Sequence, residues 1–146
     1  MTTWFLAVIG GQLFAFERDR VAGVGARRRR HSGWPTTGGQ LPLAGGRQAL
    51  VCDLLALPGM ASAGRDGLDH LLVIMVDHLW LALAMGGRGR LATLDETAWQ
   101  PLPPAFRGAA RHLVTGVLPN GADLVLRIDP QALRAWSETA AGSGAA

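Results

Sequence analysis

The sequence predicts an all-β domain, a barrel or a sandwich, that ends in one C-terminal helix. Short apolar runs recur along the chain, and turn residues such as Gly-Gly and Pro-Asn-Gly separate them. No stretch alternates strands with helices as a βαβ fold would. The runs amount to about eight to ten strands. The 146 residues are the size of one domain, and 49% of them are apolar, which is enough to close a core without metals or disulfides.

The chain opens with a predicted hairpin. Two apolar runs, "WFLAVI" and "QLFAF", flank Gly10-Gly11, and glycines accept the positive φ that tight hairpin turns require. A third apolar segment, "RVAGV", follows a charged turn. The opening has no basic region before its apolar run and no small-residue cleavage pattern, so we interpret it as the first strand and not as a signal peptide.

The segment 26–46 is the longest irregular stretch. It lacks periodicity and is rich in Gly and Pro, which predicts a loop that is functional, mobile or contains a short element. The run "QALVCDLLAL" at 48–57 then predicts a buried strand, and 58–67 a further loop.

The stretch "DHLLVIMVDHLWLALAMGG" allows three interpretations. A membrane span is disfavoured because Asp77 and His78 lie in its middle, where a charge costs about 2.5–3.5 kcal/mol. A metal site is disfavoured because His70 and His78 would lie about 12 Å apart in a helix and about 20 Å apart in a hairpin. We therefore predict a hairpin with strands at 70–76 and 79–85 that turns at the second Asp-His pair.

The last third continues as β and ends as a helix. We predict a strand at "RGRLATL", an irregular proline-rich segment at "WQPLPPAF", and a hairpin around "PNG". Asp129 is placed to cap a helix whose first residue is Pro130, with Leu133 on its inner face. We expect one domain over 1–138 and a disordered tail over 139–146.

The predicted core collects the apolar residues that these elements turn inward: Phe5, Ala7, Leu13, Phe14, Val51, Leu54, Leu72, Ile74, Leu81, Leu83, Val114, Leu124, Leu126 and Leu133.

The residues predict no enzyme, cofactor or metal site. Cys52, the single cysteine, excludes a disulfide framework and suits a reducing, cytoplasmic compartment. Its apolar neighbours predict a buried thiol with a raised pKa, which disfavours nucleophilic catalysis. His31 and His112 show no ligand spacing, and the chain has no nucleophile elbow, Walker loop or dinucleotide fingerprint.

The basic isoelectric point, near 10.9, has a simple origin. The net charge is only +3, and the chain contains arginine but no lysine and no tyrosine, so arginines that stay protonated at very high pH raise the value. One cluster stands out: Arg27, Arg28, Arg29 and Arg30 could bind a polyanion. It lacks interleaved aromatic residues for base stacking, so a solvated loop is the simpler interpretation. An acidic protein partner and a small basic β-barrel that binds nucleic acid remain alternatives.

Three segments, in order and spacing, resemble the CheW-like domain family, the adaptors that couple chemoreceptors to the histidine kinase CheA. They are "FLAVIGGQLFAFERDRVAGV", "GGRQALVCDL" and "HLVTGVLPNGADLVLRIDPQAL", and the resemblance extends from Trp4 to Trp136. The positions in register in the second and third segments are Gly46, Val51, Asp53, Leu54, Gly116, Val117, Asp129 and Leu133.

The sequence departs from the family pattern at three informative positions. Gly45 stands where the family has the Arg of an Arg-Gly pair, Leu50 replaces a proline, and Ala84 occupies a position that is usually Asp. We therefore identify the chain as a divergent member.

The resemblance implies two intertwined, small, five-stranded β-barrels of SH3-like type with a short C-terminal helix. It implies a non-catalytic adaptor in the cytoplasm, of a pilus-type or other alternative chemosensory system. The expected partners are the regulatory domain of a CheA-type kinase and a chemoreceptor's cytoplasmic tip, with no nucleic acid and no insertion into a membrane. The partner interface expected from the resemblance consists of Gly46, Arg47, Leu50, Val51 and Asp53.

Overall fold

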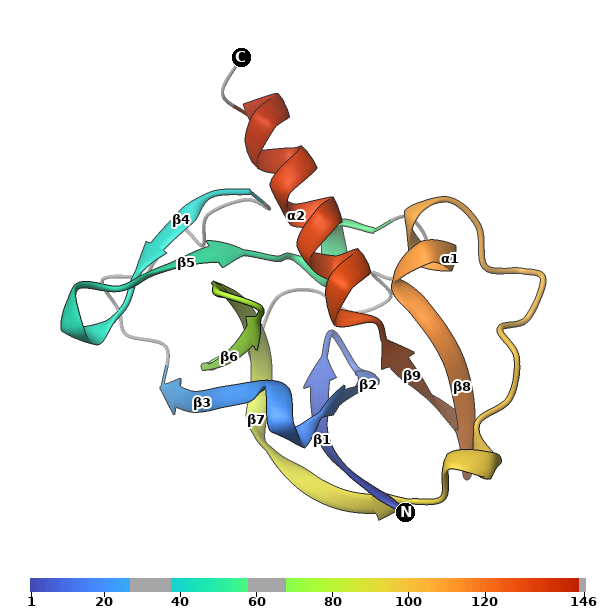
Figure 1. Cartoon of the computed structure of the whole chain (residues 1–146). Helices are drawn as coiled ribbons and strands as arrows, with labels where there is room; N and C mark the ends of the chain where they lie inside the picture. Colours follow the sequence, from blue (N-terminus) through green and yellow to red (C-terminus); the bar gives the residue numbers. More distant parts are fainter. Residues whose placement is uncertain (27–37, 58–67, 145–146) are drawn as a thin grey trace.

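The computed structural model describes residues 1–26, 38–57 and 68–144. In these residues, nine strands form one continuous sheet (Figure 1). Two α-helices accompany it, one before the eighth strand and one after the ninth. The strands are β1 (Thr2–Ile9), β2 (Gln12–Glu17), β3 (Val21–Ala26), β4 (Gln40–Pro42), β5 (Gln48–Val51), β6 (His70–Val76), β7 (Leu79–Leu94), β8 (Val114–Asn120) and β9 (Asp123–Ile128). The helices are α1 (Ala109–Leu113) and α2 (Pro130–Gly144). The prediction of a mostly β fold with a C-terminal helix is confirmed.

The long strand β7 divides the sheet into two halves. Its first part, up to Met85, pairs with β6 and β5, to which β3 and β4 are added. Its second part, from Gly86, pairs with β1, and the sheet continues through β2 and β9 to β8. Each half therefore uses five strands when β7 is counted in both.

Among the described residues, the hydrogen bonding does not close either half of the sheet into a barrel. Within the described residues, β3, β4 and β8 each pair with one strand only. Closure requires strands long enough to span the stagger between the first and last strand, and β4 and β5 have three and four residues. The expected pair of closed barrels is therefore not found.

Both faces of the sheet are buried, which explains the continuous apolar runs in the sequence. Along β6, Leu72 and Ile74 enter a central core between the two halves, while Leu71 and Val73 face the opposite way. We call the group around the latter pair the hairpin cluster; its members are Leu41, Ala49, Val51, Leu71, Val73 and Ala82, with Leu43 and Trp80 packed against them. The other half has a tryptophan cluster of Trp4, Leu6, Ala15 and Val125, with Leu13, Ala92, Leu94, Trp99 and Leu118 packed against it.

The predicted hairpin turns are confirmed. Gly10 and Gly11 turn β1 into β2 with φ of 60° and 81°. Asp77 and His78 turn β6 into β7, and Asp77 adopts a φ of 56°, the only positive value among the described residues other than glycine. Asp tolerates this region because its short polar side chain bonds locally or to a neighbour.

Helix α2 covers the central core (Figure 1). Asp129 accepts a hydrogen bond from the Gln131 amide at 3.0 Å, as its predicted capping role requires. Arg134 donates to the Asp77 carboxylate at 2.6 Å and so fastens the helix to the β6–β7 turn. The helix runs to Gly144, so the predicted start of a disordered tail at 139 is wrong; alanines favour helix, and Ala141 packs against the core.

Three further expectations are corrected. The two strands predicted at 79–85 and 88–94 are one strand, and the strand predicted at 48–57 ends at Val51 and is followed by a 3-10 turn at Leu54–Ala56. By contrast, the irregular segment 26–46 does contain a short element, β4, which is one of the alternatives predicted for it. Helix α1 lies where a strand was expected to begin.

Of the predicted core residues, all but two are buried. Leu13 is partly buried beside the tryptophan cluster, and Leu124 is 36% exposed opposite Pro119, close to the β8–β9 turn. Both residues lie near the ends of their strands, where fewer side chains pack over the sheet than at the strand centres. Period-two alternation shows which face a residue is on but not how far along the strand the packing extends.

Candidate protein-docking surface

The β4–β5 hairpin carries the predicted interface residues that are exposed. Gly45 and Gly46 turn the chain with φ of 78° and 75°, a region that glycine occupies without strain. The Leu43 amide donates to the Arg47 carbonyl at 2.7 Å and closes the turn. Arg47 therefore leaves a fixed turn with its side chain in solvent.

The Arg47 guanidinium lies over the indole of Trp80, 4.6 Å from the ring centroid. The contact depends on the parallel pairing of β5 with β7, in which Leu50 stands opposite Leu81. An exposed cation–π pair of this kind is worth about 0.5–1 kcal/mol. It holds the long arginine side chain in one place and reduces the entropy lost when a partner binds.

Apolar side chains extend this surface. Met75, which is 38% exposed, stands directly opposite Trp80 in the β6–β7 ladder, and Leu43 and Trp80 both pack on the hairpin cluster. We call Leu43, Arg47, Met75 and Trp80 the Arg47–Trp80 surface. Tryptophan, arginine and methionine are enriched in protein–protein interfaces, so this surface suits contact with a protein.

Leu50 and Val51, predicted as interface residues, are buried at 4% and 0% exposure. Their interpretation as direct contact residues is corrected: they anchor β5 in the central core and the hairpin cluster. Asp53 is partly buried, and its carboxylate accepts a hydrogen bond from the Leu55 amide at 3.1 Å. These three residues stabilise the hairpin through buried packing and a local hydrogen bond and do not form its exposed surface. The Arg27–Arg30 cluster lies outside the described residues.

Trp80 was not among the predicted interface residues. Period-two alternation along β7 puts it on the face of Ala82 and Ala84, of which Ala84 also packs in the central core, whereas the alternate positions carry the large core residues Leu81, Leu83 and Met85. A single large aromatic residue at the end of a row of alanines is a signal of an edge or surface role. That signal becomes decisive only when the pairing with Arg47 is known.

Cys52 is free and buried, as predicted, and its thiol is also hydrogen-bonded. Its sulfur lies 2.7 Å from the Ser137 hydroxyl oxygen, and Ser137 donates to the Leu133 carbonyl at 2.8 Å, which leaves the thiol as the donor to Ser137. Burial raises the pKa of Cys52 to about 12. The thiol is therefore protonated at neutral pH and unsuited to nucleophilic attack.

The repeated Asp-His pair does not form one site. At the start of β6, the Asp69 carboxylate and the His70 Nδ1 form a hydrogen bond of 2.8 Å. Asp77 and His78 lie beyond the other end of the strand. Over the described ranges, no group of three or more His, Cys, Asp or Glu side chains could hold a metal ion. No helix in the described part is long and apolar enough to cross a membrane.

Comparison with solved structures decides the fold. No protein-family model and no curated protein matches the sequence. The structure superimposes on the scaffolding protein TtCheW from Thermoanaerobacter tengcongensis with a TM-score of 0.67 and 16% sequence identity, over 88% of this chain and 84% of that chain. The chain has the CheW fold. The resemblance stated from three sequence segments is thereby confirmed at the level of the fold.

Proposed function

We propose that this chain is a non-catalytic scaffold of bacterial chemosensory signalling that couples a receptor to a CheA-type histidine kinase. The observation that carries the proposal is its likeness, over most of both chains, to a protein described as a scaffold. A fold alone does not determine function. The order of the three sequence segments and the exposed Arg47–Trp80 surface add independent support.

The Arg47–Trp80 surface is the proposed contact with the kinase regulatory domain or the receptor's cytoplasmic tip. Trp and Arg side chains carry a large share of binding energy when a partner covers them. Gly46 and Arg47 form its edge, and Leu50, Val51 and Asp53 hold the hairpin beneath it. Because Gly45 replaces the family's arginine, the proposed adaptor is a divergent one, of a pilus-type or other alternative system. The single cysteine favours a cytoplasmic location for it.

Nucleic-acid binding is the weaker candidate. It would rest on the Arg27–Arg30 cluster, which lacks interleaved aromatic residues for base stacking and lies outside the described residues. A binding titration against RNA and DNA at several salt concentrations tests this candidate. A steep loss of affinity with salt that disappears on Arg27–Arg30→Ala would support it.

The adaptor proposal is tested with the kinase regulatory domain and the receptor tip encoded in the same genome. We expect the purified chain to bind at least one of them in isothermal titration calorimetry. Trp80→Ala is expected to weaken that binding by about tenfold or more, because truncating a central aromatic anchor typically costs about 2 kcal/mol. Arg47→Ala is expected to weaken it by about threefold.

Arg90→Ala and Leu91→Ala are the matched controls. Both residues are exposed on the second part of β7, outside the Arg47–Trp80 surface, and their replacement is expected to leave the affinity unchanged. Failure of the wild-type chain to bind either partner would overturn the scaffold proposal. Equal affinities of wild type and Trp80→Ala for the partner would be compatible with the scaffold function but would overturn the proposal that the Arg47–Trp80 surface is the docking site.

A further inference from the structure

A pocket of about 380 Å³ opens in the half of the fold that does not carry the Arg47–Trp80 surface. It lies where β2 and β9 separate. Their parallel pairing ends at Ala15 and Arg127, after which β2 continues along β1 to Glu17 while β9 leads into α2. The pocket is therefore built into the strand order and does not depend on one side-chain rotamer.

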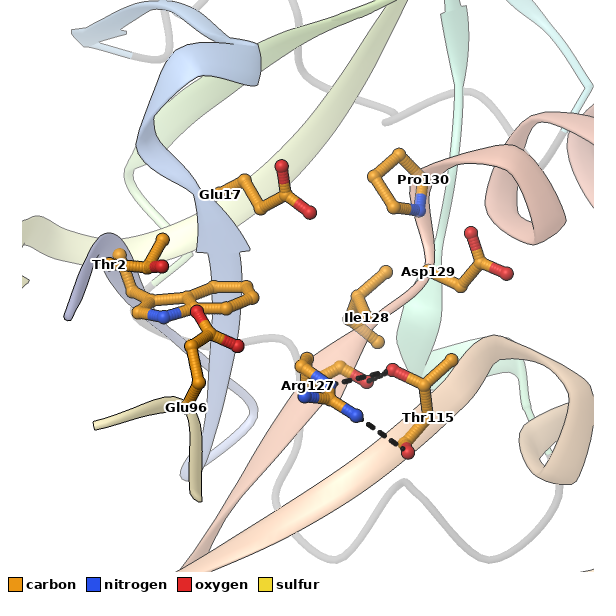
Figure 2. Close-up of a pocket in the computed structure, with 9 residues that line it drawn as sticks. Thr2, Glu17, Glu96, Thr115, Arg127, Ile128, Asp129 and Pro130 are labelled. Carbon is orange, nitrogen blue, oxygen red and sulfur yellow. Dashed lines mark hydrogen bonds between the residues drawn. The ribbon is translucent and has the colours of Figure 1, made fainter. Parts of the chain in front are cut away.

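Three carboxylates line this pocket. Figure 2 shows Glu17 and Glu96 on one side of the opening and Asp129 on the other. Asp129 caps α2, whereas Glu17 and Glu96 are exposed and their carboxylates form no ion pair or hydrogen bond with other described residues. In a chain of net charge +3, this concentration of negative charge attracts cations.

Trp4 lines the same pocket and supplies an unused donor. Its side chain is 3% exposed, and its indole Nε1 finds no acceptor among the described residues. A buried donor without a partner costs about 1–3 kcal/mol, and native proteins rarely retain one without a reason. Trp99, whose ring centroid lies 5.3 Å from that of Trp4, has the same unpaired Nε1. An acceptor from a bound molecule would satisfy Trp4.

Arg127 does not make the pocket an anion site. Its Nε donates to the Thr115 hydroxyl at 2.9 Å and its Nη2 to the Thr115 carbonyl at 3.1 Å, as drawn in Figure 2. Its guanidinium also lies 5.0 Å from the centroid of the Trp99 ring. The arginine is thus held as part of the wall, and carboxylates outnumber it.

The ligand must therefore present a cation to Glu17 and Glu96 and a carbonyl oxygen to Trp4. An arginine or lysine residue in an extended peptide carries both groups. We propose that the pocket binds a basic side chain from an extended segment of a partner protein, with Glu17 and Glu96 as counter-ions and the Trp4 indole donating to a peptide carbonyl. The Trp4 Nε1 atom is itself buried, so a lining side chain such as that of the exposed Glu96 has to move before the carbonyl can reach it.

The test uses the indole N–H signals of the full chain labelled with ¹⁵N-tryptophan. The chain has five tryptophans, and the Trp4 and Trp99 signals are assigned with Trp4→Phe and Trp99→Phe. The probe is the peptide acetyl-Ala-Ala-Arg-Ala-Ala-amide, with a peptide containing neutral citrulline in place of arginine for comparison. We expect the arginine peptide to shift the Trp4 signal and the citrulline peptide to bind about fivefold more weakly.

The double variant Glu17→Gln/Glu96→Gln is expected to bind the arginine peptide about fivefold more weakly than wild type. Both changes are at exposed side chains, so folding should be preserved. Asp123→Asn, an exposed carboxylate at the β8–β9 turn, is the matched control and should bind as wild type does. An unmoved Trp4 signal up to the solubility limit of the peptide, or equal affinity for both peptides, would overturn the proposal and leave the scaffold function untouched.

Discussion

Leu133→Ala is expected to lower the free energy of unfolding by about 2–5 kcal/mol. Leu133 is 0% exposed and lies on the face of α2 that packs into the central core. Its removal leaves a cavity between the two halves of the sheet, and strands fixed on both sides cannot collapse into it. Urea denaturation followed by circular dichroism measures the change.

Gln131→Ala is the matched control for this prediction. Gln131 is exposed on the same helix, and its side chain makes one long contact, 3.4 Å, with Asp77. We expect its replacement to change the stability by less than about 0.5 kcal/mol. A loss below about 1 kcal/mol for Leu133→Ala would show that α2 does not cap the core.

Local signals predicted the hairpins and the start of α2. Gly10-Gly11 needs only the conformational freedom of two adjacent glycines, and Asp129-Pro130 needs only a capping oxygen and a fixed φ. Each of these features is decided by residues that are neighbours in the sequence.

The continuity of β7 could not be predicted in the same way. The run "GGRGR" contains the boundary between the two predicted strands, 79–85 and 88–94, and Gly87 and Gly89 adopt φ of 63° and 70°. Nevertheless the strand passes through it, because β1 pairs along the second part of β7. A side chain on Gly89 would meet the ring of Phe5, so that glycine serves close packing between strands and not a chain reversal.

Only part of the candidate surface could be predicted, because the rest also depends on pairing between distant strands. Gly46 and Arg47 follow from a local turn and a motif, but the role of Trp80 depends on parallel pairing between β5 and β7. Leu50 and Val51 lie in an apolar strand whose two faces are both buried. Alternation therefore could not show which positions reach the surface.

The second large effect concerns Cys52 at alkaline pH. Burial raises the pKa of its thiol from 9.0 to about 12 in the folded state. Between these values the unfolded chain releases a proton that the folded chain keeps. The thiol's contribution to stability is therefore fully present below about pH 9 and is lost as the pH rises, by about 1.4 kcal/mol per pH unit.

This chain isolates the effect because it contains no lysine and no tyrosine, the side chains that would otherwise titrate in the same range. Guanidinium denaturation under reducing conditions from about pH 8 to 11 measures the slope. In Cys52→Ser the hydroxyl keeps a hydrogen-bonding group beside Ser137, 2.7 Å from Cys52 in the native protein, and does not titrate there. We expect a falling stability in the wild type and a flat profile in Cys52→Ser; parallel profiles would show that the thiol is accessible to ionisation in the folded state.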